Sequence, residues 1–166
     1  MKIVAKGDFV ELLYTGKANG EIFDSNIEED LKKISPEAKP SKTYAIIGEG
    51  MVIKGLDHAL EGKEIGKKYT VSIPSKEGFG PRQASLIRPL PLKAFTDKKV
   101  YPQIGMSLVL DNTVVHIRAI SGARVIADFN NPLAGKDLEY AFTIVEKIED
   151  ISQKTKIFFE RFFRTS

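Results

Sequence analysis

The first half of the chain contains three short stretches in which β-forming residues predominate. Residues 9–15 and 42–47 are two such runs, and a glycine follows each, which predicts a strand and then a turn. Residues 69–74 alternate Tyr, Val and Ile with Thr and Ser, as a strand with one buried face does. Residues 26–40 are charged and contain two prolines, which favours an exposed loop with a short helical turn at most.

A different period marks residues 51–61. Val52, Leu56, Ala59 and Leu60 recur at helical spacing, and the glycine that follows Glu61 is a suitable stop. The pattern therefore predicts one short amphipathic helix that packs against a β-framework.

The middle of the chain has the pattern of a separate module. Residues 78–82 form a turn cluster, and the two prolines within residues 88–91 exclude the interior of a helix. Two-residue turn signals, Asp-Asn and Ser-Gly, then separate three β-rich runs. These runs are residues 106–110, 113–120 and 123–129. We expect a small β-meander in this region.

The end of the chain returns to the first pattern and then changes again. After a turn cluster at residues 130–135, strand alternation resumes over residues 138–148, so the first domain is expected to continue there. From Ile151 onward, apolar residues fall at helical intervals and predict a C-terminal amphipathic helix. Its apolar face comprises Ile157, Phe158, Phe159, Phe162 and Phe163. Such a face needs a partner surface. That surface is the core or the insert of this chain, a second copy of the chain, or a region beyond residue 166.

Composition agrees with a folded protein of two small domains. The 166 residues are 42% hydrophobic and 28% charged, near globular averages. No apolar run approaches the ~20 residues that a membrane-spanning helix needs, and we expect no secretory signal, because residues 1–8 lack its uninterrupted apolar core. The chain has no cysteine, which fits a reducing cytoplasm. The net charge of +3, with interleaved lysines and acids, indicates a solvated surface; a nucleic-acid-binding β-protein is the weaker alternative.

Side chains suited to covalent or metal chemistry are sparse. His58 and His116 stand apart, without a second ligand at metal-binding spacing, so each is interpreted as an ordinary packed or surface residue. No serine lies in a nucleophile motif, and the glycine-rich stretches at 48–53 and 62–67 lack the spacing of nucleotide loops. The acidic run at 28–30 leads directly into lysines and is interpreted as solvated surface. We therefore expect neither a cofactor nor a metal.

Two longer motifs carry a more specific signal. Residues 7–25 read G-x-x-V-x-x-x-Y-T-G-x-x-x-G-x-x-F-D-S, which resembles the opening signature of the FKBP-type peptidyl-prolyl cis-trans isomerases. Residues 48–66 read G-x-G-x-V-I-x-G-L-D-x-A-L-x-G-x-x-x-G, which is similar to the central strand-to-helix segment of that family. With Gly78-Phe79-Gly80 and P-L-A-G-K at residues 132–136, the resemblance covers most of residues 1–148.

In short members of this family the chain passes almost directly from the turn at Gly80 to the last strand, whereas here about fifty residues intervene. This is similar to the archaeal and SlyD-like branch, in which an insert-in-flap domain binds unfolded chains. The resemblance implies an α+β fold: an antiparallel β half-barrel wrapped on one short helix, with a small inserted all-β domain. The expected domains are 1–83 with 130–150 (isomerase), 84–129 (insert) and 151–166 (C-terminal helix).

The resemblance also implies which residues act. The expected catalytic residues are Tyr14, Phe23, Asp24, Phe79 and Tyr140, and the expected substrate-binding residues are Val52, Ile53, Leu56 and Leu133. From spacing alone, Val52, Ile53 and Leu56 fit an ordinary core equally well. Leu56 replaces a tryptophan that often floors the family's pocket, and Phe79 stands where many relatives have a tyrosine. Both departures count against macrolide binding.

The implied function is a peptidyl-prolyl cis-trans isomerase and folding chaperone of the cytoplasm. It would accelerate Xaa-Pro isomerisation in unfolded or proline-containing polypeptides, with neither nucleic acid nor membrane as a partner. The insert would hold clients by strand addition and apolar contact, unless its apolar residues form its own core instead. The residues in question are Leu108, Val109, Val114 and Ile117. The alternative is a holdase or peptide-binding module with incidental isomerase activity.

Overall fold

The computed structural model describes residues 2–162 of the chain. Its contacts divide the chain into two compact units: a first unit of Met1–Gly78 with Lys136–Ser166, and a second unit of Phe79–Gly135. The second unit extends beyond both ends of the insert that the sequence predicts. Within the described residues no helix has the length and apolar character needed to cross a membrane.

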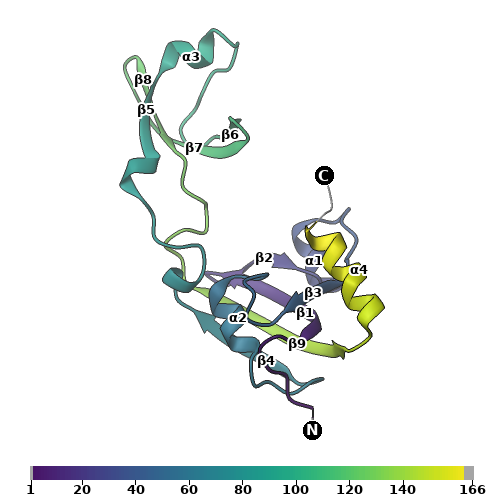
Figure 1. The fold of residues 1–166 in the computed structure, drawn as a ribbon. Coiled ribbons are helices and arrows are strands. Elements are labelled where there is room, and N and C mark those ends of the chain that lie inside the picture. Colours follow the sequence, from purple (N-terminus) through teal and green to yellow (C-terminus); the bar gives the residue numbers. More distant parts are fainter. Residues whose placement is uncertain (1, 163–166) are drawn as a thin grey trace. The chain divides into compact units, whose positions relative to one another are not determined.

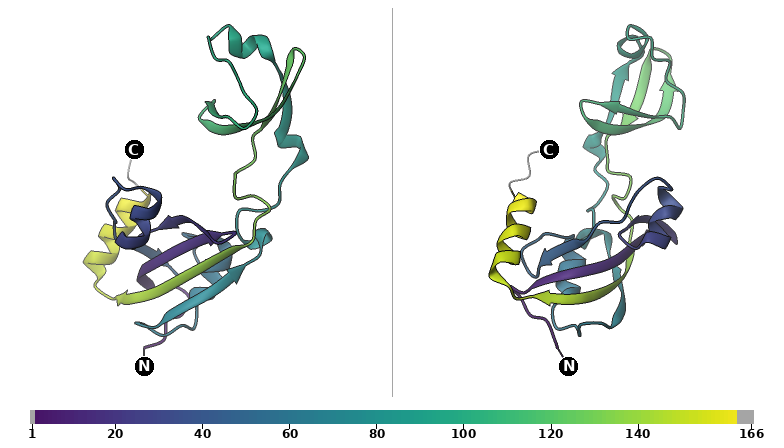
Figure 2. Two further views of the ribbon diagram at one scale, coloured as in Figure 1. Left: turned by 180° about the vertical axis from the view of Figure 1, so that it is seen from behind. Right: turned by 90° about the vertical axis from the view of Figure 1, so that its right-hand side faces the viewer.

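A five-stranded antiparallel sheet forms the first unit. Its central strand β1 (Phe9–Ala18) pairs on one edge with β2 (Glu21–Ser25) and β3 (Thr43–Ile46). On the other edge β1 pairs with β9 (Leu138–Ile148), which pairs in turn with β4 (Lys68–Ile73). Seen from behind, β1 in purple and β9 in green run side by side through the sheet (Figure 2).

One face of this sheet and a single helix enclose the core of the first unit. Helix α2 (Lys54–Leu60) lies against the sheet (Figure 1) and buries Leu56 and Leu60. A Cβ atom on Gly55 would lie 2.5 Å from Ile73 Cγ2, so only glycine lets α2 approach β4 this closely. Alternate residues of β9 complete the core: Leu138, Tyr140, Phe142 and Ile144. The predicted α+β class, with a curved sheet on one short helix, is confirmed.

The region between β2 and β3 is more ordered than the sequence pattern indicated. It contains a helix, α1 (Glu28–Ile34), rather than a single turn. Acidic residues occupy its first turn and lysines its last. These charges interact favourably with the helix dipole and so stabilise the helix. The Thr15 hydroxyl donates a 2.7 Å hydrogen bond to Asp30 Oδ2 and so ties α1 to β1. This bond, and then the hydrogen bond from the Lys33 ammonium, lowers the pKa of Asp30 below its usual range.

The C-terminal helix that the sequence predicts is present as α4 (Ile151–Phe162). Ile157 is buried, and the Lys154 ammonium lies 5.2 Å from the centroid of the Phe9 ring, so α4 packs near the start of β1. Phe159 on the same helix is 54% exposed. Phe163, the last member of the predicted apolar face, lies outside the described residues.

The second unit is a four-stranded antiparallel sheet with strand order β5-β8-β7-β6. Strands β6 (Ser107–Leu110), β7 (Thr113–Ser121) and β8 (Arg124–Asp128) are the three runs of the predicted meander. Asp111 and Asn112 join β6 to β7 with φ of 49° and 62°, the left-handed conformation that such two-residue hairpin turns require.

Two elements of the second unit were not predicted. Strand β5 (Ile87–Pro91) contains two prolines, which a sheet tolerates because β5 lies at its edge. Helix α3 (Leu92–Thr96) follows and contributes Phe95 to a core that also contains Ile117 and Val125. The expectation that Ile117 contacts clients is therefore wrong, because its side chain is buried in the unit's own core.

Two short 3-10 turns complete the described elements. One lies in the first unit, at Ser75–Glu77 (η1), and one in the second unit, at Ala84–Leu86 (η2).

Candidate active site

Four of the predicted catalytic residues lie close together where β2, β1 and β9 run side by side. The Tyr14 hydroxyl donates a hydrogen bond to Asp24 Oδ2 at 3.0 Å. The Tyr14 and Tyr140 ring centroids are 6.1 Å apart, and the Phe23 ring meets the Tyr140 ring edge-on at 5.8 Å and 87°. We call Tyr14, Phe23, Asp24 and Tyr140 the ring cluster. Edge-to-face packing of this kind is favourable and fixes ring orientation.

Gly16 makes the ring cluster possible, although the sequence analysis did not single it out. It lies opposite Asp24 on β2 and opposite Tyr140 on β9. A Cβ atom on residue 16 would lie 2.9 Å from both Phe23 Cζ and Tyr140 Cε1, closer than real Cβ contacts come. The two rings therefore occupy the space above a residue without a side chain. The sequence pattern predicted a turn at Gly16, after a strand over residues 9–15; that prediction is wrong, because β1 continues through Gly16 to Ala18.

The two tyrosines of the ring cluster remain protonated. Burial raises the pKa of Tyr140 to about 12, and the nearby negative charge of Asp24 adds to the effect. Burial also raises the pKa of Tyr14, and the charge of Asp24 and the hydrogen bond to it raise it further. Tyr14 is therefore a hydroxyl donor at neutral pH, and its O–H donates to the carboxylate of Asp24.

Buried polar residues hold the middle of β1 and the end of β2 in place. The Tyr14 backbone N–H donates to Asn26 Oδ1 at 2.8 Å, and Asn26 Nδ2 donates to the Leu12 carbonyl at 2.7 Å. Ser25, also buried, bonds through its hydroxyl to the Tyr14 carbonyl and to Thr15. These contacts fix the backbone on either side of Tyr14 and Asp24. Nothing in the sequence pattern marks Asn26, because its role depends on contacts with a strand that is distant in sequence.

The predicted residues Val52, Ile53 and Leu56 lie at the start of α2. Val52 and Ile53 are partly exposed, whereas Leu56 is 2% exposed and presents little surface to a ligand. Ile53 is the residue just before the helix, and its extended backbone leaves its N–H outside the helical hydrogen-bond pattern.

Asp57 fixes the turn that leads to these residues. Its buried carboxylate accepts the Gly48 N–H at 2.8 Å and the Gly50 N–H at 3.1 Å. Both glycines have positive φ, of 87° and 68°. Asp57 therefore sets the path of the chain into Ile53, a role that the sequence analysis did not assign.

The remaining predicted site residues, Phe79 and Leu133, belong to the second unit. Phe79 lies where the chain enters that unit and Leu133 shortly before it leaves. The Gly135 N–H donates to the Gly80 carbonyl at 2.7 Å, so the two stretches are paired next to these residues. That Phe79 and Leu133 contact the same substrate as the ring cluster remains a prediction. Among residues 2–162, no group of three His, Asp or Glu side chains is arranged to hold a metal.

Comparison with protein families now identifies the class. Residues 1–92 match the family described as FKBP-type peptidyl-prolyl cis-trans isomerase. Residues 88–133 match a second family, the FKBP26 IF domain. The chain belongs to the FKBP-type peptidyl-prolyl cis-trans isomerases, as the motif resemblance predicted, and carries the inserted domain as well. It is an enzyme of that class.

Individual relatives agree with this assignment. The chain is 34% identical over 154 residues to a short-type peptidyl-prolyl cis-trans isomerase from Methanocaldococcus jannaschii, covering 91% of this chain and 96% of the relative. It is 31% identical to SlyD of Haemophilus influenzae over 102 residues, 59% of this chain and 53% of that one. For SlyD of Escherichia coli K12 the identity is 30%, over 59% and 52% of the two chains. The match thus spans about half of each SlyD protein.

Proposed function

We propose that the ring cluster forms part of a prolyl-binding site and that the enzyme isomerises Xaa-Pro bonds in unfolded polypeptides. The observation that carries this proposal is the packing of Phe23 and Tyr140 over Gly16, beside the Tyr14–Asp24 hydrogen bond. The arrangement offers apolar ring surface next to a single oriented carboxylate. A prolyl ring packs well on apolar ring surface. The charge distribution of a twisting amide interacts with the field of the carboxylate.

Such a site can act without a covalent step. Amide resonance opposes rotation about the peptide bond with a barrier of about 18–20 kcal/mol. The planar bond has a larger resonance dipole than the twisted one, so removal from water destabilises the ground state more than the transition state. Lowering the barrier by about 4 kcal/mol gives roughly a thousandfold acceleration. Apolar surroundings and fixed dipoles of the kind seen in the ring cluster are suited to that task.

Most of the predicted residues have a role in this proposal. Phe23 and Tyr140 contact the prolyl ring, and Asp24, held by Tyr14, contributes its field at the twisting bond. The backbone N–H of Ile53 binds a substrate carbonyl; within residues 2–162 no hydrogen bond from this N–H is formed. The remaining apolar contacts come from Val52, Phe79 and Leu133, whereas Leu56, at 2% exposed, belongs to the core.

We assign client capture to the second unit. Its sheet has two edge strands, and β6 is the one without proline. Val109 on β6 and Val114 on β7 lie opposite each other and are 70% and 48% exposed. An extended client segment can pair with the free edge of β6 and cover these two side chains. Leu108 is excluded from this role because it packs against the unit's core.

A refolding assay with two substrates tests the proposal. Turnover is measured on a short proline peptide and on an unfolded protein whose refolding is limited by proline isomerisation. Replacing residues 84–127 by a short turn keeps Arg82, Asp128 and Asn130, and should preserve most peptide turnover and sharply reduce turnover on the protein. If the intact chain binds unfolded protein but does not accelerate the peptide reaction, it is a holdase and the catalytic proposal fails.

Two further points extend the proposal. The cytoplasm is the proposed compartment, supported by the absence of cysteine from the sequence.

Self-association through α4 is proposed because Phe158 and Phe159 are 41% and 54% exposed on one helix. Sedimentation of the intact chain tests this second point: a monomer at all concentrations contradicts it.

A further inference from the structure

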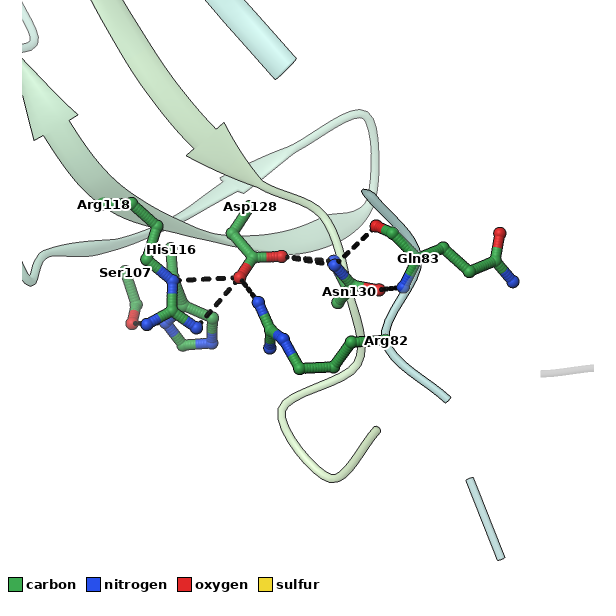
Figure 3. Close-up of polar contacts among 7 residues, drawn as sticks. All are labelled: Arg82, Gln83, Ser107, His116, Arg118, Asp128 and Asn130. Carbon is green, nitrogen blue, oxygen red and sulfur yellow. Dashed lines mark hydrogen bonds and ion pairs between the residues drawn. The ribbon is translucent and has the colours of Figure 1, made fainter. Parts of the chain in front are cut away.

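The second unit begins and ends in two stretches of chain that are bonded to each other. We call residues 79–83 the entry segment and residues 128–135 the exit segment. Gln83 and Asn130 exchange two hydrogen bonds, from the Gln83 N–H to Asn130 Oδ1 at 2.8 Å and from Asn130 Nδ2 to the Gln83 carbonyl at 3.2 Å (Figure 3). With the Gly80–Gly135 backbone bond, these contacts join the two segments at both ends.

Arg82 lies along the exit segment. A Cβ atom on Gly135 would lie 3.2 Å from Arg82 Cγ, so the stem of the arginine packs on that glycine. Its guanidinium group reaches the other end of the exit segment, where Nη2 donates to Asp128 Oδ2 (Figure 3). One side chain therefore spans the exit segment from Gly135 to Asp128. Arg82 is the residue of the entry segment that makes this connection.

Asp128 is held by more than this one contact. Its side chain is 1% exposed, and Oδ2 also accepts Arg118 Nε at 2.9 Å from strand β7. Oδ1 accepts the backbone N–H of Asn130 at 3.0 Å and its Nδ2 at 2.8 Å. Burial acts to raise the pKa of Asp128, but the hydrogen bonds from Arg82, Asn130 and Arg118 together hold it well below the usual range. The carboxylate thus stays charged, and two arginines share it.

The two arginines differ in what they connect. Arg118 joins Asp128 to a neighbouring strand of the same sheet, whereas Arg82 joins it to the entry segment. Phe79 lies three residues before Arg82, and Leu133 two residues before Gly135. We infer that Arg82 is a positioning residue for the isomerase reaction, which braces the two segments so that Phe79 and Leu133 are presented in a fixed arrangement. This inference rests on the proposed function, in which both residues contact substrate.

The pair of arginines supplies a matched experiment. Arg82→Gln and Arg118→Gln each remove one cation from the same buried carboxylate and leave the other in place, so their losses of stability should be similar. We expect Arg82→Gln to lower kcat/KM on a short proline peptide by about tenfold, as a misplaced contact residue does. Arg118→Gln should change it less than about twofold, and Arg82→Lys should recover part of the loss because its ammonium can still reach Asp128.

A double-mutant cycle separates positioning from general stability. If Arg82 acts through Phe79, Arg82→Gln should cost little more once Phe79→Ala is present. Equal kcat/KM for Arg82→Gln and Arg118→Gln, or additive effects of Arg82→Gln and Phe79→Ala, would overturn the inference while the wild-type enzyme remains active. A wild-type chain with no peptide turnover would overturn the proposed function, and the inference with it. Thermal unfolding of all variants is measured as well, to check that Arg82→Gln and Arg118→Gln lose similar stability.

Discussion

The side chains of Tyr14 and Asp24 meet across two paired strands, with the phenolic oxygen 3.0 Å from Oδ2. Asp24 is exposed, so its carboxylate keeps access to solvent on one side. Tyr14 restricts it on the other side and supplies a proton that the raised pKa of the phenol keeps in place at neutral pH. The direction of the carboxylate is therefore set by a neutral donor.

This relationship predicts unequal effects of two substitutions. Asp24→Ala removes the charge from the site and should lower kcat/KM on a proline peptide by about tenfold or more. Tyr14→Phe removes only the orienting hydrogen bond and should cost about threefold, since a bond to a partly solvated carboxylate contributes modestly. The protease-coupled peptide assay measures both. Unchanged rates for Asp24→Ala would remove this carboxylate from the mechanism.

Gly16→Ala tests whether the packing of the two rings matters for turnover. The new methyl group would lie 2.9 Å from both the Phe23 and Tyr140 rings, so at least one ring must move. We expect a fall in kcat/KM, accompanied by a loss of about 1–3 kcal/mol in the free energy of unfolding, as for other overpacked sites. Wild-type kinetics in a variant whose structure shows displaced rings would contradict the proposed site.

Asp57→Ala should affect both stability and substrate binding. It leaves the N–H groups of Gly48 and Gly50 without their acceptor, at a cost of about 1–3 kcal/mol. The turn before Ile53 then loosens, so KM should rise more than kcat falls. Asp137→Ala is the matched control, because Asp137 Oδ1 also accepts a backbone N–H, that of Ser75, but at an exposed position. Similar KM values in the two variants would count against the role of Asp57.

The raised pKa of Tyr140 predicts a loss of folding stability at alkaline pH. The pKa of Tyr140 is about 12 in the folded chain against 10.0 for an ordinary tyrosine, so the neutral form is favoured by folding. Its contribution to stability is complete below pH 10.0 and is lost as the pH rises towards 12. Denaturant unfolding at several pH values should show a shallower alkaline decline for Tyr140→Phe than for the wild type. Parallel curves would mean that Tyr140 titrates normally.

The exposed valine pair of the second unit predicts where clients bind. Val109→Thr combined with Val114→Thr keeps the shape of both side chains but reduces their apolar surface. Affinity for an unfolded protein should fall about fivefold, while peptide turnover stays unchanged. Leu13→Thr alters an apolar residue on the first unit that is 39% exposed, and it serves as the control. An equal loss in Leu13→Thr would show that capture is not specific to β6 and β7.

Much of the fold could be predicted from local pattern. The alternation of Leu138, Tyr140 and Phe142 identified a strand with one buried face, and the helical spacing of Leu56 and Leu60 identified α2. The motifs then supplied the ring cluster. These features are encoded by neighbours in sequence, or by fixed positions within a short motif.

What could not be predicted depends on contacts between distant residues. Gly16 matters because two rings from other strands lie above it, and Asn26 because it bonds to Leu12 and Tyr14 on another strand. Strand β5 was missed because its prolines argue against a strand unless its edge position is known.

The position of β5 has a consequence for how the protein behaves when crowded. A sheet with two open borders can recruit strands on both sides and so seed growth into a fibre. Here Pro89 and Pro91 remove two backbone N–H donors from the β5 edge of the second unit's sheet. The β6 edge is therefore the one suited to pairing with a further strand. In the proposed mode of capture, β6 pairs with one extended client segment, and the prolines of β5 disfavour growth of the sheet at its other edge.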